Sequence, residues 1–156
     1  TRATLRSQAD RLMHYVEEGG TVVVQYNTQS RLGPLEGKVG PYPLEIGRGR
    51  VTDQLAAMTV LAPGHELLTR PNKIGPADFD GWVQERGLYF AETWDSHYTP
   101  IFAAADPDEK PLNGSLLFAR YGKGRYVYTG LAFFRQLPAG VPGAYRLFLN
   151  LIGDQR

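Results

Sequence analysis

The chain has 156 residues, of which 42% are hydrophobic and 21% charged, the balance of one ordinary globular domain. The net charge is +1 and no basic stripe stands out, so we expect no binding to nucleic acid. No run approaches the roughly 18–20 apolar residues that cross a bilayer, which argues against a membrane protein. The absence of cysteine excludes disulfides, thiolate zinc sites and cysteine nucleophiles, and it leaves the compartment open, a periplasmic or secreted location included.

The first element predicted is a helix over residues 3–18. Its apolar positions recur at helical spacing, and Gly19 and Gly20 end it. A β-branched strand follows over residues 21–26. A helix that leads into a buried parallel strand normally comes after another strand of the same sheet. We therefore expect the chain to be the C-terminal part of a longer protein that supplies the first strand or strands, the alternative being a domain that starts with a helix.

Residues 27–57 are rich in glycine, proline and charge, and they predict a long loop with a short strand at 44–46. The pattern after the loop predicts a strand over 58–62, a one-turn helix over 65–69 and a short helix over 76–84. Further strands are expected over 88–91 and 99–105. Loops of such length are often functional or lie between domains, so residues 27–57 are a candidate contact region.

Residues 115–152 carry the clearest structural signal. Two nearly all-apolar strands flank Gly122-Lys-Gly, which predicts a tight hairpin turn rather than a phosphate loop, because it lies between strands and lacks the required spacing. Such strands must be covered on both faces, which predicts a layered α/β domain. A closing helix begins near Val141, with a buried side made by Tyr145, Leu147, Phe148, Leu151 and Ile152.

The segment 82–98 is the best candidate for a binding site. It contains both tryptophans of the chain together with charged groups, namely Trp82, Glu85, Arg86, Tyr89, Trp94, Asp95, His97 and Tyr98. Aromatic rings beside carboxylates and arginine suit stacking on a sugar or another polar ring. The alternative is that Trp82 and Trp94 cap the core while the charges form a solvated rim.

Asp95 and His97 lie two residues apart, so on an extended segment they would share one face. Such a pair could serve a metal or act as a His–Asp pair, with His65 and Asp80 as possible further ligands. An exposed histidine in a loop is the alternative.

The order of elements resembles the class I glutamine amidotransferase-like fold. Residues 78–90 (Asp-Phe-Asp-Gly-Trp-Val-Gln-Glu-Arg-Gly-Leu-Tyr-Phe) and the block 119–151 resemble a bacterial domain that follows deacetylases of the PIG-L/LmbE type. The resemblance implies a three-layer, flavodoxin-like mixed sheet with a C-terminal β-hairpin and a closing helix.

The resemblance also implies which chemistry is missing. Working amidotransferases of this fold use a cysteine at a strand-to-helix elbow and a His-x-Glu pair after a late strand. This chain has no cysteine and has Gly-Leu-Ala-Phe-Phe-Arg over residues 130–135. In the deacetylases the zinc site belongs to a separate N-terminal domain, so none of its residues is carried over.

We therefore expect a single domain over residues 1–156, acting as a non-catalytic accessory domain of a sugar deacetylase. It would dock onto the N-terminal deacetylase domain or bind carbohydrate through residues 82–98. We expect no cofactor in this chain, with zinc confined to the deacetylase domain. One alternative is a metal-dependent hydrolase that uses Asp95 and His97, and another is a purely structural interaction domain whose loop 27–57 packs against a neighbour.

Overall fold

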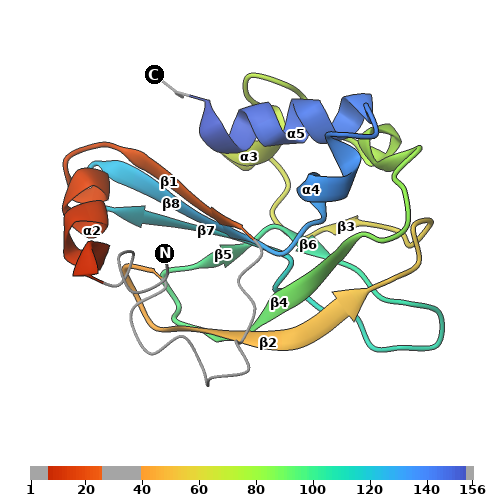
Figure 1. Ribbon diagram of the computed structural model, residues 1–156, viewed down its shortest axis with the longest axis horizontal. Coiled ribbons are helices and arrows are strands. Elements are labelled where there is room, and N and C mark those ends of the chain that lie inside the picture. Colours follow the sequence, from red (N-terminus) through yellow and green to blue (C-terminus); the bar gives the residue numbers. More distant parts are fainter. Residues whose placement is uncertain (1–6, 26–39, 154–156) are drawn as a thin grey trace.

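The computed structural model describes residues 7–25 and 40–153, and the elements follow one another as Figure 1 shows. The helices are α2 (Ala9–Glu17), α3 (Glu66–Thr69), the 3-10 turn η1 (Pro76–Phe79), α4 (Phe133–Gln136) and α5 (Pro142–Ile152). The strands are β1 (Thr21–Gln25), β2 (Leu44–Val51), β3 (Thr59–Val60), β4 (Gly87–Trp94), β5 (Thr99–Pro100), β6 (Phe102–Ala103), β7 (Leu116–Tyr121) and β8 (Gly124–Thr129).

The central sheet is mixed and has the strand order β1-β8-β7-β5. β1 runs parallel to β8, whereas β7 is antiparallel to both β8 and β5. The predicted hairpin is present: Tyr121 pairs with Gly124 across a two-residue turn in which Gly122 has a φ of +57°, a value that favours glycine. The α/β character is confirmed. The flavodoxin-like order is not confirmed, because β1–β8 is the one parallel pair among the strands of the described residues.

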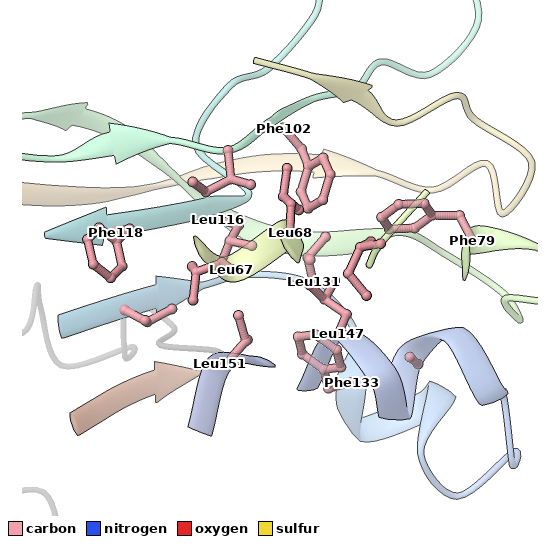
Figure 2. Close-up of a cluster of buried hydrophobic side chains, with 14 of the residues drawn as sticks. Leu67, Leu68, Phe79, Phe102, Leu116, Phe118, Leu131, Phe133, Leu147 and Leu151 are labelled. Atoms are coloured by element: carbon pink, nitrogen blue, oxygen red, sulfur yellow. The ribbon is translucent and has the colours of Figure 1, made fainter. Parts of the chain in front are cut away.

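One face of the sheet is covered by α3 and α5 (Figure 1). Leu147 and Leu151 of α5 are fully buried, and they pack with side chains of β7 such as Leu116 and with Leu67 of α3 (Figure 2). Each fully buried leucine contributes roughly 1.5–3 kcal/mol to folding. This apolar layer is the main core of the domain.

The other face is covered by α2 and by the ribbon of β2 and β4 (Figure 1). Leu117, Tyr126 and Tyr128 project from β7 and β8 into this second core, where they meet Ala91 of β4 and Tyr98. The sequence predicts three strand residues at 44–46, but β2 extends to Val51 because it pairs along the whole of β4, with register shifts on the way. The third layer is therefore partly a β-ribbon.

The buried side of α5 differs from the predicted one. Leu147 and Leu151 are buried as expected, but Tyr145 and Ile152 are 46% and 48% exposed. Gly143 and Asn150 take the buried places instead. A Cβ at residue 143 would lie 2.0 Å from the carbonyl oxygen of Asp78, so glycine lets α5 lie directly against η1. The helix is thereby rotated relative to the side that apolar periodicity predicts.

Asn150 is the polar residue that makes this rotation possible. Its Nδ2 donates hydrogen bonds to the carbonyl oxygens of Leu67, at 2.9 Å, and Asn72, at 2.8 Å, and its Oδ1 accepts one from the amide of Asn72. A buried amide that is hydrogen-bonded in this way carries no large desolvation penalty.

Other predicted elements are shorter in the structure. The helix expected over 76–84 is one 3-10 turn ending at Phe79, because Gly81 adopts a φ of +71° and redirects the chain. The strand expected over 58–62 is only two residues long. Residues 3–6 of the predicted first helix and 27–39 of the predicted loop lie outside the described residues. Among the helices of the described residues, none has the length and apolar character needed to cross a membrane.

Candidate functional site

The candidate segment 82–98 is divided by β4. Trp82, Glu85 and Arg86 precede this strand, whereas Asp95 and His97 follow it. Eight residues of β-strand span on the order of 25 Å, so the two groups lie at opposite ends of the ribbon. The structure therefore does not bring the eight predicted residues together into one site.

Trp82 belongs to the main core. Its side chain is 2% exposed, and its ring centroid lies 5.4 Å from that of Phe79 and 6.0 Å from that of Phe133. The indole Nε1 donates a hydrogen bond to the carbonyl oxygen of Asp78 at 3.0 Å. With its ring enclosed and its one donor used, Trp82 has a structural role.

Glu85 and Arg86 are also buried and engaged. Arg135 Nε lies 2.5 Å from Glu85 Oε1. Arg86 donates from Nε to the carbonyl oxygen of Ala56 at 2.9 Å and from Nη1 to that of Phe79 at 2.6 Å. Burial lowers the pKa of Arg86, although an arginine stays protonated at neutral pH. These contacts fix the start of β4 against its neighbours.

Tyr89 lies within β4 and links the ribbon to the sheet. It is half-buried, has a φ of +57°, and its carbonyl oxygen accepts a hydrogen bond from the hydroxyl of Tyr128. A positive φ is uncommon for a tyrosine. This link between the ribbon and the sheet is made by the backbone of Tyr89.

A surface cluster surrounds the C-terminal end of β4 and includes two residues, Tyr42 and Tyr121, that the sequence prediction missed. We call it the Tyr42 cluster, and it consists of Tyr42, Trp94, Asp95, His97 and Tyr121. The rings of Tyr42 and His97 stack with centroids 4.1 Å apart and planes 10° apart, and Tyr121 meets Tyr42 edge-on at 5.8 Å. Trp94 is half-buried and pairs with Leu44, two residues from Tyr42.

Asp95 holds the ring of His97 in place. Its Oδ1 lies 2.5 Å from His97 Nδ1 and also accepts a hydrogen bond from the backbone amide of His97 at 2.9 Å. The backbone hydrogen bond, followed by the one with the ring, lowers the pKa of Asp95. Because Nδ1 is engaged, Nε2 is the ring nitrogen left for a ligand, and the His97 side chain is 60% exposed.

Tyr98 is a buried residue that holds Tyr42 of this cluster in place. It is 3% exposed, its hydroxyl donates to the carbonyl oxygen of Tyr42 at 3.1 Å, and burial raises its pKa to about 12. A Cβ at residue 40 would lie 2.3 Å from the Tyr98 hydroxyl, so glycine is needed where the chain crosses this ring. The position of Tyr42 is therefore fixed by a buried partner 56 residues away.

The described residues contain no group of three His, Cys, Asp or Glu side chains that could hold a metal ion. His65 and Asp80, the possible further ligands, do not join Asp95 and His97. His65 is instead the N-cap of α3, where its Nδ1 accepts a hydrogen bond from the amide of Leu67. The Tyr42 cluster thus offers aromatic faces, a carboxylate and an imidazole, which suits binding of a polar ring.

Leu131, Ala132 and Phe133 lie in the segment 130–135, where the resemblance led us to look for a catalytic pair, and their side chains pack in the core. Leu131, Ala132 and Phe133 are at most 1% exposed, and the amide of Ala132 donates to the carbonyl oxygen of Arg86 at 3.0 Å. This turn therefore joins the sheet to the start of β4.

No model of a protein family matches the chain, and a search of curated proteins also finds no match. Among solved structures, a cytoplasmic protein from Salmonella typhimurium is similar at 14% identity with a TM-score of 0.55, covering 92% of this chain and 58% of that one. A cold-adapted β-galactosidase from Rahnella sp. R3 gives 17% identity and a TM-score of 0.42, over 91% of this chain and 20% of the enzyme. The first likeness concerns the fold alone, and this chain spans little more than half of that protein.

Proposed function

We propose that this chain is a non-catalytic accessory domain of a PIG-L/LmbE-type sugar deacetylase and that it binds carbohydrate at the Tyr42 cluster. The assignment to such a deacetylase rests on the resemblance of residues 78–90 and 119–151. The observation that carries the ligand assignment is the exposed stack of His97 on Tyr42, with Asp95 holding the imidazole.

The chemistry of the cluster fits a sugar. The exposed side of the His97 ring can lie against the C–H face of a pyranose, while the imidazole Nε2 and the free lone pairs of Asp95 can bind hydroxyl groups. One aromatic contact contributes about 0.5–1.5 kcal/mol beyond the area it buries. Since the site offers few contacts on an exposed surface, we expect weak binding. A dissociation constant of roughly 0.1–1 mM corresponds to a binding free energy of about −4 to −5.5 kcal/mol.

The site is held in its shape before a ligand binds. The Tyr98 hydroxyl donates a hydrogen bond to the carbonyl oxygen of Tyr42 and accepts one from the Tyr42 amide at 3.4 Å. At the other end of the side chain, the Tyr42 hydroxyl donates to the carbonyl oxygen of Arg120 at 3.1 Å. A ring fixed at both ends loses little conformational entropy on binding, so the contact energy is retained as affinity.

Binding is favoured over metal-dependent hydrolysis because Asp95 and His97 lie on an exposed surface and the described residues add no third ligand to them. The purely structural alternative draws support from Trp82, whose ring is enclosed. Trp94, a member of the Tyr42 cluster, is half-buried, which is compatible with a role in ligand binding.

Isothermal titration calorimetry with N-acetylated oligosaccharides, such as a tetramer of N-acetylglucosamine, tests the ligand. His97→Ala should weaken binding at least about fivefold, because it removes the exposed ring and one hydrogen-bonding atom, each worth about 0.5–1.5 kcal/mol. His14→Ala is the matched control, since His14 is 66% exposed beside two glutamates on α2 and should leave binding unchanged. Wild-type protein that binds none of the panel, or His97→Ala that binds as tightly as wild type, would refute the proposal.

A further inference from the structure

The pair formed by Asp95 and His97 presents two polar atoms to the solvent, and both of them accept hydrogen bonds. Asp95 Oδ1 accepts from the backbone amide of His97 at 2.9 Å and lies 2.5 Å from His97 Nδ1. Within the described residues, Asp95 Oδ2 has no hydrogen-bond partner. With its Nδ1 proton directed at the carboxylate, the imidazole presents Nε2 as an acceptor as well. The side chains of Asp95 and His97 are 32% and 60% exposed, so a ligand can reach both atoms.

The hydroxyl groups beneath this pair donate within the protein. The Tyr42 hydroxyl donates to the carbonyl oxygen of Arg120, and the Tyr98 hydroxyl donates to the carbonyl oxygen of Tyr42, each at 3.1 Å. A tyrosine hydroxyl has a single proton to donate, so neither group has one left for a ligand. A ligand that binds at Asp95 and His97 therefore has to bring the donors itself.

The chain segments that carry the pair contain carboxylates but no cationic side chain. Residues 40–47 and 87–101 have no lysine or arginine, and their carboxylates are Glu45, Glu92 and Asp95. Glu45 lies opposite Thr93, whose hydroxyl donates to Glu45 Oε2 at 2.9 Å, and Thr93 is two residues before Asp95. The amide of Asp95 donates to the carbonyl oxygen of Pro43, which continues the pairing of the two strands, so Glu45 and Asp95 border the same face of the ribbon.

The cations beside Tyr121 are directed elsewhere. Arg120 precedes Tyr121 on β7 and therefore points to the other face of the sheet, where its Nη2 lies 2.7 Å from Glu66 Oε2 of α3. Lys123 lies in the hairpin turn, where its amide donates to the carbonyl oxygen of Glu17 at the end of α2. Among the described residues, the electrostatic potential at the exposed pair is thus dominated by the carboxylates.

We propose that the Tyr42 cluster binds amino sugars with a free, protonated amine in preference to their N-acetylated forms, and that Asp95 is the residue that selects them. This inference rests on the proposed carbohydrate site and adds the class of sugar. An ammonium group has three N–H donors and no acceptor, so it complements Asp95 Oδ2, while a hydroxyl of the same sugar donates to His97 Nε2. An N-acetyl group brings one donor, and its carbonyl oxygen would face acceptors. A sugar acid is disfavoured further, because Asp95 and Glu45 would repel its carboxylate.

Calorimetry with two tetramers, one of glucosamine and one of N-acetylglucosamine, tests this selectivity at pH 7 and about 0.1 M salt. An exposed ion pair changes affinity by up to about fivefold, and the unpaired acetyl oxygen adds to the difference. Wild-type protein should therefore bind the glucosamine tetramer at least about threefold more tightly than the N-acetylated one. Equal affinities, or tighter binding of the N-acetylated tetramer, would overturn this inference and leave the carbohydrate site standing. Failure of both tetramers to bind would refute the site as well.

Two variants assign the preference to one carboxylate. Asp95→Asn retains an oxygen for the backbone amide of His97 but loses the charge, so it should bind the two tetramers with affinities within about a factor of 1.5. Glu18→Gln is the matched control, because Glu18 lies 3.5 Å from His14 on α2 and its loss changes the net charge by the same amount. This control should retain the preference. A preference that survives in Asp95→Asn, or that is lost in Glu18→Gln, would contradict selection by Asp95.

Ionic strength gives a second readout that requires no substitution. Raising the salt concentration from about 0.1 M to about 1 M shortens the Debye length from about 10 Å to about 3 Å. Binding of the glucosamine tetramer should weaken at least about twofold over this range, while binding of the uncharged N-acetylated tetramer changes less. Equal salt dependence of the two tetramers would contradict recognition of the ammonium group by a carboxylate.

Discussion

Replacing each tryptophan by alanine separates the two ends of β4. Trp82 is enclosed by Phe79 and Phe133, whereas Trp94 is half-buried at the edge of the second core. If the first is structural and the second lies beside a surface site, Trp82→Ala should destabilise the protein far more than Trp94→Ala. The comparison uses the only two tryptophans in the chain.

The magnitude follows from burial. Removing a fully buried tryptophan costs about 3–5 kcal/mol, including the cavity that remains. Trp82→Ala also removes one of the two rings under the Arg86 guanidinium, whose central carbon lies 5.7 Å from the indole, and this contact contributes about 0.5–2 kcal/mol. A half-buried ring should cost about 1–2 kcal/mol at Trp94.

Urea denaturation followed by far-ultraviolet circular dichroism measures both changes. With a slope of about 2 kcal/mol per molar urea, Trp82→Ala should lower the midpoint by about 2 M and Trp94→Ala by less than about 1 M. Trp82→Phe retains most of the packing and gives a measurable value where the alanine variant does not fold. Midpoint losses that are equal for the two alanine variants, or larger for Trp94→Ala, would refute the assignment of Trp82 to the core.

Two further predictions concern packing and pH. Gly143→Ala should lower the free energy of unfolding by about 2 kcal/mol in the same denaturation assay, because the new Cβ would lie 2.0 Å from the Asp78 carbonyl oxygen. Gly75→Ala is the control and should lower it little, because a Cβ there would have no atom within 4 Å. Equal losses of stability for the two variants would show that α5 does not need glycine at residue 143. Burial raises the pKa of Tyr98 to about 12 and raises that of Tyr126 well above its ordinary value near 10. The stability that these buried, neutral tyrosines contribute is therefore fully present below pH 10 and is lost as the pH rises toward 12. A titration of tyrosine ionisation followed by ultraviolet absorbance should show a late-titrating group whose ionisation is coupled to unfolding. Uniform titration of all tyrosines near pH 10 without loss of structure would contradict the burial of Tyr98 and Tyr126.

Local pattern was enough to predict the elements whose residues interact with near neighbours in sequence. The hairpin of β7 and β8 is closed by Gly122 and a run of apolar residues, and α5 follows it as expected. The rotation of α5 was not predictable, because it depends on Gly143 meeting Asp78, and the two lie 65 positions apart. Apolar periodicity records which residues prefer burial, but not which neighbour a helix will meet.

The candidate site also depends on contacts between residues that are distant in sequence, which local pattern does not predict. Sequence proximity grouped Trp82 with His97, but a strand between them carries the two to opposite ends of the ribbon. Tyr42 and Tyr121 were missed because they lie in a Gly- and Pro-rich stretch and beside a hairpin turn, and only the fold brings them to His97. A tyrosine between Pro41 and Pro43 was the one local hint, since such a ring has few ways to reach a core.

Nuclear magnetic resonance of the two indole N–H groups tests most directly whether a sugar binds after the end of β4. Each tryptophan gives one indole cross-peak, so a titration with the N-acetylglucosamine tetramer reports on both ends of the strand at once. We predict that the Trp94 signal shifts with a saturating curve that matches calorimetry, while the Trp82 signal stays in place. A shift of Trp82 alone, or no shift of either signal while binding saturates, would contradict a carbohydrate site at the Tyr42 cluster.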